Sequence, residues 1–224
     1  MIQLFWLRTD LRIADNTALS QALSNGPTVA VYLITPQQWL AHDDAPCKVD
    51  FWLRNLACLR EQLGKLNIPL LIRNCADWQQ APVTLLQLSQ QIGAGAVHCN
   101  EEYGIHETRR DRACSSLLEP QGIAFTAHFD QLLLKPGSVL TQSGNYFQVF
   151  SQFRKVCYQR LHRSLPACLP YPAAQAALPV SSDELPTTVS GFTPPDASLR
   201  QLWPAGETAA QQRLQQFAEQ YMDA

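Results

Sequence analysis

Five short apolar runs, separated by stretches with helical spacing, constrain the fold of this chain more than any other feature. The runs are Ile2–Leu7, Val29–Ile34, Pro69–Ile72, Ala96–Cys99 and Ile123–His128. The helical stretches are Thr17–Leu23, Val49–Leu66 and Val83–Ile92, of which the second carries one continuous apolar stripe. Strands that are apolar throughout and alternate with helices predict a parallel sheet that is buried on both faces.

This alternation predicts the fold class. A sheet of five parallel strands with helices on both faces is the α/β architecture called Rossmann-like or doubly wound. Ligands bind such a sheet beyond the carboxyl ends of its strands, near the point where the strand order reverses. The loops that follow strands therefore form the candidate site, and they include Thr35–Trp39, Asn74–Trp78, Asn100–Glu107 and Phe129–Gly137.

Composition and charge narrow the class of protein. The 224 residues suffice for one large domain or for a domain with an extension, and 46% hydrophobic with 16% charged residues is typical of a globular chain. A net charge of -2 does not indicate the basic face of a free-standing DNA-binding protein, so another part would have to hold any nucleic acid. We find neither a membrane-spanning run nor a signal sequence, and we expect a cytoplasmic monomer.

The seven cysteines do not point to chemistry. They are scattered, odd in number and without a C-x-x-C pair, which argues against a metal site and against a disulfide framework. Several lie in apolar runs, where cysteine behaves as a small hydrophobic residue. We expect structural thiols and no metal.

The last quarter of the chain differs in character. Residues 165–205 are rich in Pro, Ala, Ser and Thr, which is typical of an extended linker and not of a core. Residues 206–224 form an amphipathic helical pattern without a stop signal, so we expect more protein to follow. The expected organisation is an α/β domain at 1–164, the linker at 165–205, and the start of a further domain at 206–224.

The stretch WLRTDLRIADN, Trp6–Asn16, places two arginines and two aspartates directly after the first predicted strand. One interpretation is structural, because Arg8, Asp10, Arg12 and Asp15 can bond to one another and to loop carbonyls, while Asp15 or Asn16 caps a helix. The other gives Arg8 a ligand-facing role. The residues alone favour the structural interpretation.

Two further patterns have a functional and a structural interpretation. Phe147, Phe150 and Phe153 lie at helical spacing, where they could stack on bases, but packing in a core is the favoured interpretation. The arginines between Arg109 and Arg112 could contact DNA. Because acidic residues surround them, a solvated and salt-bridged face is favoured.

Several segments together resemble one family. The stretch WLRTDLRIADN is similar to the opening of the DNA photolyase and cryptochrome family, and Thr35-Pro36 with Trp39 resembles its second strand exit. NIPLLIR, NEEYGIHETRRD and LKPGSVLTQSGNYFQVFSQF, at Asn67–Arg73, Asn100–Asp111 and Leu134–Phe153, resemble its later segments. The resemblance runs from about residue 2 to 164, in the correct order, and it is strongest to bacterial class I cyclobutane dimer photolyases.

The resemblance implies a function. Members of the family carry an N-terminal α/β domain that can hold an antenna chromophore, and then a helical domain that binds FAD and UV-damaged DNA. In photolyases the excited flavin donates an electron to a cyclobutane pyrimidine dimer, which then splits. The expected antenna is 5,10-methenyltetrahydrofolate. This chain ends before the flavin and DNA segments, so we expect it to hold no catalytic residue.

The same resemblance assigns the candidate site residues. An Asn-Glu pair after the fourth strand meets the pterin in these photolyases, and His106 and Glu107 occupy its positions here. A carboxylate such as Glu107 can accept two hydrogen bonds from the adjacent N–H groups of a pterin edge. His106 departs from the pattern and leaves the identity of the antenna open. Asn100 and Glu101 are second-tier candidates, and each could equally serve a turn or a cap. The structural alternative for the pair is a glutamate favoured by a helix dipole beside an exposed histidine.

Two rival functions remain. The corresponding domain of a cryptochrome photoreceptor would share this sequence pattern and differ in the other half of the protein. An unrelated nucleotide-binding α/β domain would require a phosphate-gripping glycine loop, and the sequence has neither G-x-G-x-x-G nor a Walker loop after a strand.

Overall fold

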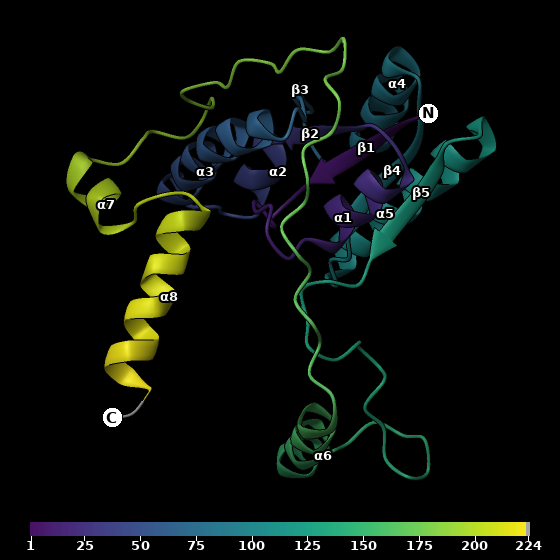
Figure 1. The fold of residues 1–224 in the computed structure, drawn as a ribbon, viewed down its shortest axis with the longest axis vertical. Coiled ribbons are helices and arrows are strands. Elements are labelled where there is room, and N and C mark those ends of the chain that lie inside the picture. Colours follow the sequence, from purple (N-terminus) through teal and green to yellow (C-terminus); the bar gives the residue numbers. More distant parts are fainter. Residues whose placement is uncertain (223–224) are drawn as a thin grey trace.

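The computed structural model describes residues 1–222 and contains five strands and eight α-helices within them (Figure 1). The strands are β1 (Ile2–Leu7), β2 (Thr28–Ile34), β3 (Leu70–Asn74), β4 (Ala94–Asn100) and β5 (Ala124–His128). The helices are α1 (Thr17–Asn25), α2 (Pro36–Ala41), α3 (Pro46–Lys65), α4 (Ala81–Ile92), α5 (Ile105–Leu118), α6 (Phe150–Arg163), α7 (Ala197–Leu202) and α8 (Glu207–Tyr221), with a 3₁₀ turn, η1 (Glu119–Gln121), after α5.

The five strands form one parallel sheet in the order β3-β2-β1-β4-β5. From β1 the chain adds β2 and then β3 on one side of the sheet. It then crosses over and adds β4 and β5 on the other side of β1. The strand order therefore reverses between β1 and β4. This confirms the predicted doubly wound α/β fold, with all five strands at the predicted places.

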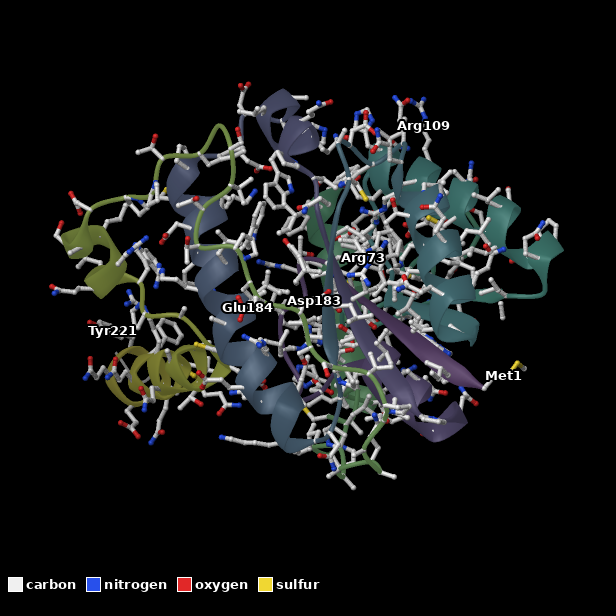
Figure 2. The ribbon with its side chains drawn as sticks, turned by 90° about the horizontal axis from the view of Figure 1, so that it is seen from above. Met1, Arg73, Arg109, Asp183, Glu184 and Tyr221 are labelled. Carbon is white, nitrogen blue, oxygen red and sulfur yellow. The ribbon has the colours of Figure 1, made fainter. Side chains whose placement is uncertain are left out.

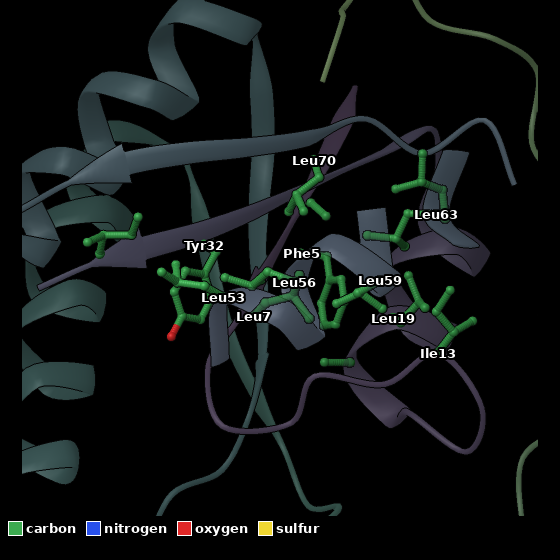
Figure 3. Close-up of a cluster of buried hydrophobic side chains, with 14 of the residues drawn as sticks. Phe5, Leu7, Ile13, Leu19, Tyr32, Leu53, Leu56, Leu59, Leu63 and Leu70 are labelled. Carbon is green, nitrogen blue, oxygen red and sulfur yellow. The ribbon is translucent and has the colours of Figure 1, made fainter. Parts of the chain in front are cut away.

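Helices cover both faces of the sheet because neighbouring residues of each strand point to opposite sides. Phe5 and Leu7 of β1 pack with α1 and α3, whereas Leu4 and Trp6 pack with α4 and α5. The predicted stripe of α3 is confirmed. Figure 3 shows it against the sheet through the leucines Leu53, Leu56, Leu59 and Leu63.

Two local expectations were wrong. β5 is an edge strand whose residues are half-buried or exposed, so only the central strands are buried on both faces. The segment after β2 was expected to be a loop, but it forms the short helix α2, which has Pro36 in its first turn. Proline suits that turn because its missing N–H would have no partner there.

The predicted linker packs on the domain more closely than expected. Val189 and Phe192 are buried and belong to the core on the α1 and α3 face. Further upstream, Asp183 donates its backbone N–H to the carbonyl of Leu70 in β3. Its carboxylate forms an ion pair with Arg73 at 2.6 Å, and Figure 2 shows both side chains. The linker thus lies along the edge strand β3, where it satisfies backbone groups that the sheet leaves open. The segment also contains one helix, α7.

Two helices stand away from the sheet (Figure 1). No residue of α6 or α8 is buried, and the ring of Phe150 is 72% exposed. The prediction that the phenylalanines before and in α6 pack in a core was therefore wrong for the described chain, because the segment from Phe129 to Val149 carries α6 beyond the reach of the sheet. Within residues 1–222, no helix is both long and apolar enough to cross a membrane.

Candidate functional site

The carboxyl ends of β1 and β4 lie side by side at the point where the strand order reverses. Arg8 follows β1 directly, and Asn100 ends β4. The guanidinium of Arg8 donates to the backbone carbonyl of Asn100. This contact ties the two central strands together at the position where α/β sheets hold their ligands.

Arg8 belongs to a buried cluster of two arginines and two carboxylates. Its Nη1 donates to both oxygens of Asp111, at 2.7 and 2.8 Å. Arg110 donates to Glu102 at 2.8 Å and to Asp111 at 2.9 Å. Each charge has an opposite partner inside the cluster, which is the condition for keeping charges buried. The structural role predicted for Arg8 is confirmed in kind, but its side-chain partners are Asp111, Glu102 and the carbonyl of Asn100, and not the aspartates of the opening stretch.

The cluster shifts the pKa values of its members. Burial alone would raise the pKa of Glu102, but the charges of Arg8 and Arg110 outweigh burial and lower it. For Arg8, burial opposes the charged form, and the facing carboxylates still raise its pKa. Both groups therefore stay ionised. The cluster provides a fixed arrangement of charges and does not act as a proton donor or acceptor.

A second network explains the other polar residues of the opening stretch. The side chain of Asn100 donates to Asp10 at 2.6 Å, and its oxygen accepts from the backbone of Ala18 at 2.9 Å. Asn16, not Asp15, caps α1 by accepting from the backbone of Leu19 at 3.1 Å. Asn100, a second-tier binding candidate, is thus fully buried and engaged within the protein.

The backbone donors between β1 and α1 are occupied by side chains of the same chain. Ile13 and Ala14 donate to the carboxylate of Glu207, at 3.0 and 3.1 Å. Thr17, in the first turn of α1, donates to Asp130 at 2.9 Å. A nucleotide-binding sheet would offer such donors to a phosphate. Their occupation by carboxylates argues against that rival function.

A cleft of about 160 Å³ opens beside this network, at the carboxyl ends of β1 and β2. Five aromatic side chains line it: Trp6, Tyr32, Trp39, Trp52 and Trp78. Trp39 and Trp52 form a tilted pair with ring centroids 5.2 Å apart. The guanidinium of Arg110 lies 4.7 Å from the ring centroid of Trp6 and 4.8 Å from that of Trp78. A concave site with aromatic walls and a few charged groups is typical of a small-molecule site.

The structure separates the two predicted site residues. Both lie in the first turn of α5, but only Glu107 lines the cleft. Its carboxylate folds back over Gly104, where an added Cβ would clash with Oε2 of Glu107. His106 is exposed, and its ring centroid lies 5.6 Å from that of His42 at the rim.

Other predicted candidates lie elsewhere. Glu101 is half-buried and faces a separate depression beside β5. Arg109 and Arg112 are exposed, as expected for a solvated face. Arg110 is salt-bridged to Glu102 and Asp111, as predicted, but it is buried and not solvated. Arg110 is buried because its side chain faces the carboxylates of Glu102 and Asp111.

The tryptophans of the cleft were not predicted as a group. Trp39 and Trp78 each follow a strand exit, and Trp52 lies on α3 between residues that face the core. For Trp39 and Trp78, the position after the exits of β2 and β3 was the available signal, whereas Trp52 had none. Within residues 1–222, no cluster of three or more His, Cys, Asp or Glu side chains could hold a metal ion.

Comparison with known proteins identifies relatives of the chain. The sequence model described as DNA photolyase matches residues 3–173. The chain is 43% identical over 155 residues to the deoxyribodipyrimidine photo-lyase of Vibrio cholerae, a match that covers 69% of this chain and 33% of that protein. It is 31% identical over 222 residues to the deoxyribodipyrimidine photo-lyase of Salmonella typhimurium, covering 98% and 46% respectively. The chain thus spans between a third and a half of these two relatives.

Solved structures of photolyases and a cryptochrome share the fold of this chain. A class III photolyase from Agrobacterium tumefaciens superposes with a TM-score of 0.78 at 25% identity, covering 97% of this chain and 44% of that one. The cryptochrome of Synechocystis superposes with a TM-score of 0.79 at 25% identity, covering 97% and 46%. The sequence match and the shared fold lead to one conclusion, which is that the chain belongs to the DNA photolyase family.

Proposed function

We propose that this chain is the light-harvesting domain of a deoxyribodipyrimidine photolyase, and that its cleft binds a reduced folate, 5,10-methenyltetrahydrofolate. When bound, the folate would absorb light and pass the excitation to FAD in a helical domain of the whole protein. There, the energy would drive repair of cyclobutane pyrimidine dimers in DNA. The sequence relatives named as photolyases favour this function over that of a cryptochrome.

One observation carries the folate proposal. The carboxylate of Glu107 and the aromatic walls share one cleft. A carboxylate can accept two hydrogen bonds from the adjacent N–H donors of a pterin ring, and flat aromatic rings can stack on tryptophan. Glu107 would therefore orient the ring, while the tryptophans would exclude water from it.

The nearby charges support the same assignment. Arg110 is held by Glu102 and Asp111, so these groups are matched within the protein. Lys48 lies at the cleft with its Nζ 4.9 Å from the ring centroid of Trp52 and 2.6 Å from Asp44. Glu107 has no ion pair within residues 1–222, so its carboxylate is free to meet a ligand.

The proposed partner is the FAD-binding helical domain of the same protein. Exposed aromatic residues on α6 and α8, including Phe150 and Phe217, would be covered by it. Through that domain the whole protein would contact UV-damaged DNA, and we expect the protein to act as a monomer. Because the antenna cleft would lie partly against that domain, we expect this chain alone to bind folate weakly.

A titration tests the folate site. Methenyltetrahydrofolate is added to the purified chain, and binding is followed by near-UV absorbance and fluorescence. Replacing Glu107 by Ala should weaken binding about 10-fold to 100-fold, as expected for the loss of hydrogen bonds to a charged group. The matched control is Glu101→Ala, which removes a half-buried glutamate outside the cleft and should leave binding unchanged.

One result would contradict the assigned contact: equal affinities of the wild type and Glu107→Ala would remove Glu107 from the site. Tight stoichiometric binding would support the folate site and refute only our expectation that this chain alone binds folate weakly. The whole protein separates the two family functions. Absence of light-dependent dimer repair, in a sample with reduced flavin, would favour the cryptochrome function.

A further inference from the structure

The first turn of α8 is bound to the loop between β1 and α1, almost 200 residues earlier in the chain. Both oxygens of Glu207 are used, since Ile13 donates to one at 3.0 Å and Ala14 to the other at 3.1 Å. Farther along α8, the guanidinium of Arg213 lies 5.0 Å from the ring centroid of the exposed Trp203. No residue of α8 is buried, so its main attachment lies at its start.

A second set of contacts fixes the backbone next to Glu207. The N–H of Gly206 donates to the side chain of Asn55 at 2.9 Å, and Arg54 donates to the carbonyl of Trp203 at 2.9 Å. Gly206 has φ of +98°, and a Cβ there would lie 3.1 Å from the sulfur of Cys58. Only glycine suits this position. The chain thus enters α8 with a defined direction between α3 and the loop.

We propose that Glu207 is a positioning residue that fixes the direction of α8 relative to the sheet. Two consecutive backbone N–H groups form a small concavity for an anion, and a carboxylate makes charge-assisted hydrogen bonds there. The same loop lines the antenna cleft at its other end, through Arg8 and Thr9. If α8 begins the flavin domain, a point that rests on the proposed function, this anchor sets the angle between the cleft and the flavin.

A purely local role must be distinguished from the anchor. Glu207 lies in the first turn of α8, where any negative charge stabilises the helix through its dipole. Glu207→Asp keeps that charge but shortens the side chain by one methylene, so it should keep the helix and lose the contact with the loop. Glu219→Ala removes an exposed glutamate near the other end of α8 and is the matched control. The carboxylate of Glu219 accepts a hydrogen bond at 2.8 Å from Gln215 of the same helix.

The experiment uses NMR on this chain and requires no chromophore. Amide exchange is measured at Ile13 and Ala14, and residual dipolar couplings are measured for α8 and α3. In the wild type and in Glu219→Ala, the two helices should fit one alignment tensor. In Glu207→Ala and Glu207→Asp, exchange at the two loop amides should rise about 10-fold to 100-fold, as expected for the loss of hydrogen bonds to a charged group, and the couplings of α8 should shrink.

Couplings of α8 that stay unchanged in both Glu207 variants would overturn the proposal, as would unchanged exchange at the loop amides. Unshifted amide resonances of the central strands verify that each variant is folded. Should Glu207→Ala fail this check, Glu207→Asp alone decides the result. Because the test measures geometry and not folate binding, it can succeed or fail independently of the antenna function.

Discussion

Replacing Arg8 by Met should destabilise the fold strongly, because Arg8 joins β1 to β4 and to α5 from a buried position. The substitution removes two hydrogen bonds to Asp111 and one to the carbonyl of Asn100. Breaking a buried ion pair costs about 3–5 kcal/mol. Arg110 still pairs with Glu102 and Asp111 at 2.8 and 2.9 Å, so neither carboxylate is left alone. We therefore expect the lower end, about 3 kcal/mol.

For a chain of 224 residues, each kcal/mol shifts Tm by about 2–4 °C, so Arg8→Met should lower it by about 6–12 °C. Urea unfolding followed by far-UV circular dichroism measures the free energy directly. Lys48→Met is the control, because the Lys48 side chain is 53% exposed and its pair with Asp44 contributes about 0–1 kcal/mol. An Arg8→Met variant that loses no more than this control would refute the idea that the cluster holds the two strands together.

Two other features give testable expectations. His98 and His128 lie in contact, with ring nitrogens 3.0 Å apart, and burial lowers the pKa of both below the ordinary value. The unfolded chain then binds more protons near pH 6, so the unfolding free energy measured in urea should fall as the pH drops from about 7 to 5. His128→Gln should reduce that slope, and an equal slope would exclude the pair as its source. Phe192→Ala should cost about 3–5 kcal/mol in the same assay, since the ring is buried in the core, whereas Phe150→Ala should stay within about 0.5 kcal/mol. Equal effects of the two would show that the linker does not contribute to the core.

The paired charge after the first strand now has a physical explanation. The loop from Arg8 to Asn16 receives contacts from several later parts of the chain. Asp111 and Asn100 meet Arg8, while Asp130 meets Arg12 at 2.6 Å and Glu207 meets the backbone. Charged and polar residues are required there because segments from four later parts of the chain contact this loop, and the polar groups buried by these contacts need partners.

Much of the fold could be predicted from the sequence because its signals are local. A run of apolar residues specifies a buried strand, and the α3 stripe specifies a helix with one buried face. The boundaries of these elements shift by only a few residues in the structure. The position of β5 at an edge was not predictable in this way, since burial of a strand depends on which neighbours it finds.

The candidate site was predictable only in part. Motif resemblance selected Glu107, and the structure places it in the cleft. It also selected His106, which the structure places at the rim. Neither motif nor spacing revealed that Trp39, Trp52 and Trp78 share one cavity, because the three come from different elements and meet only after the sheet has formed.

By itself, the sequence determined the five parallel strands, the helices α1, α3 and α4 that cover them and the family, since each rests on periodicity or on short motifs read along the chain. Tertiary structure decided which charges pair, which loop donors are filled, and that Val189 and Phe192 of the linker join the core. Those outcomes depend on contacts between residues far apart in the chain. Their free energy comes from burial and from the pairing of desolvated groups, and neither exists until the segments meet.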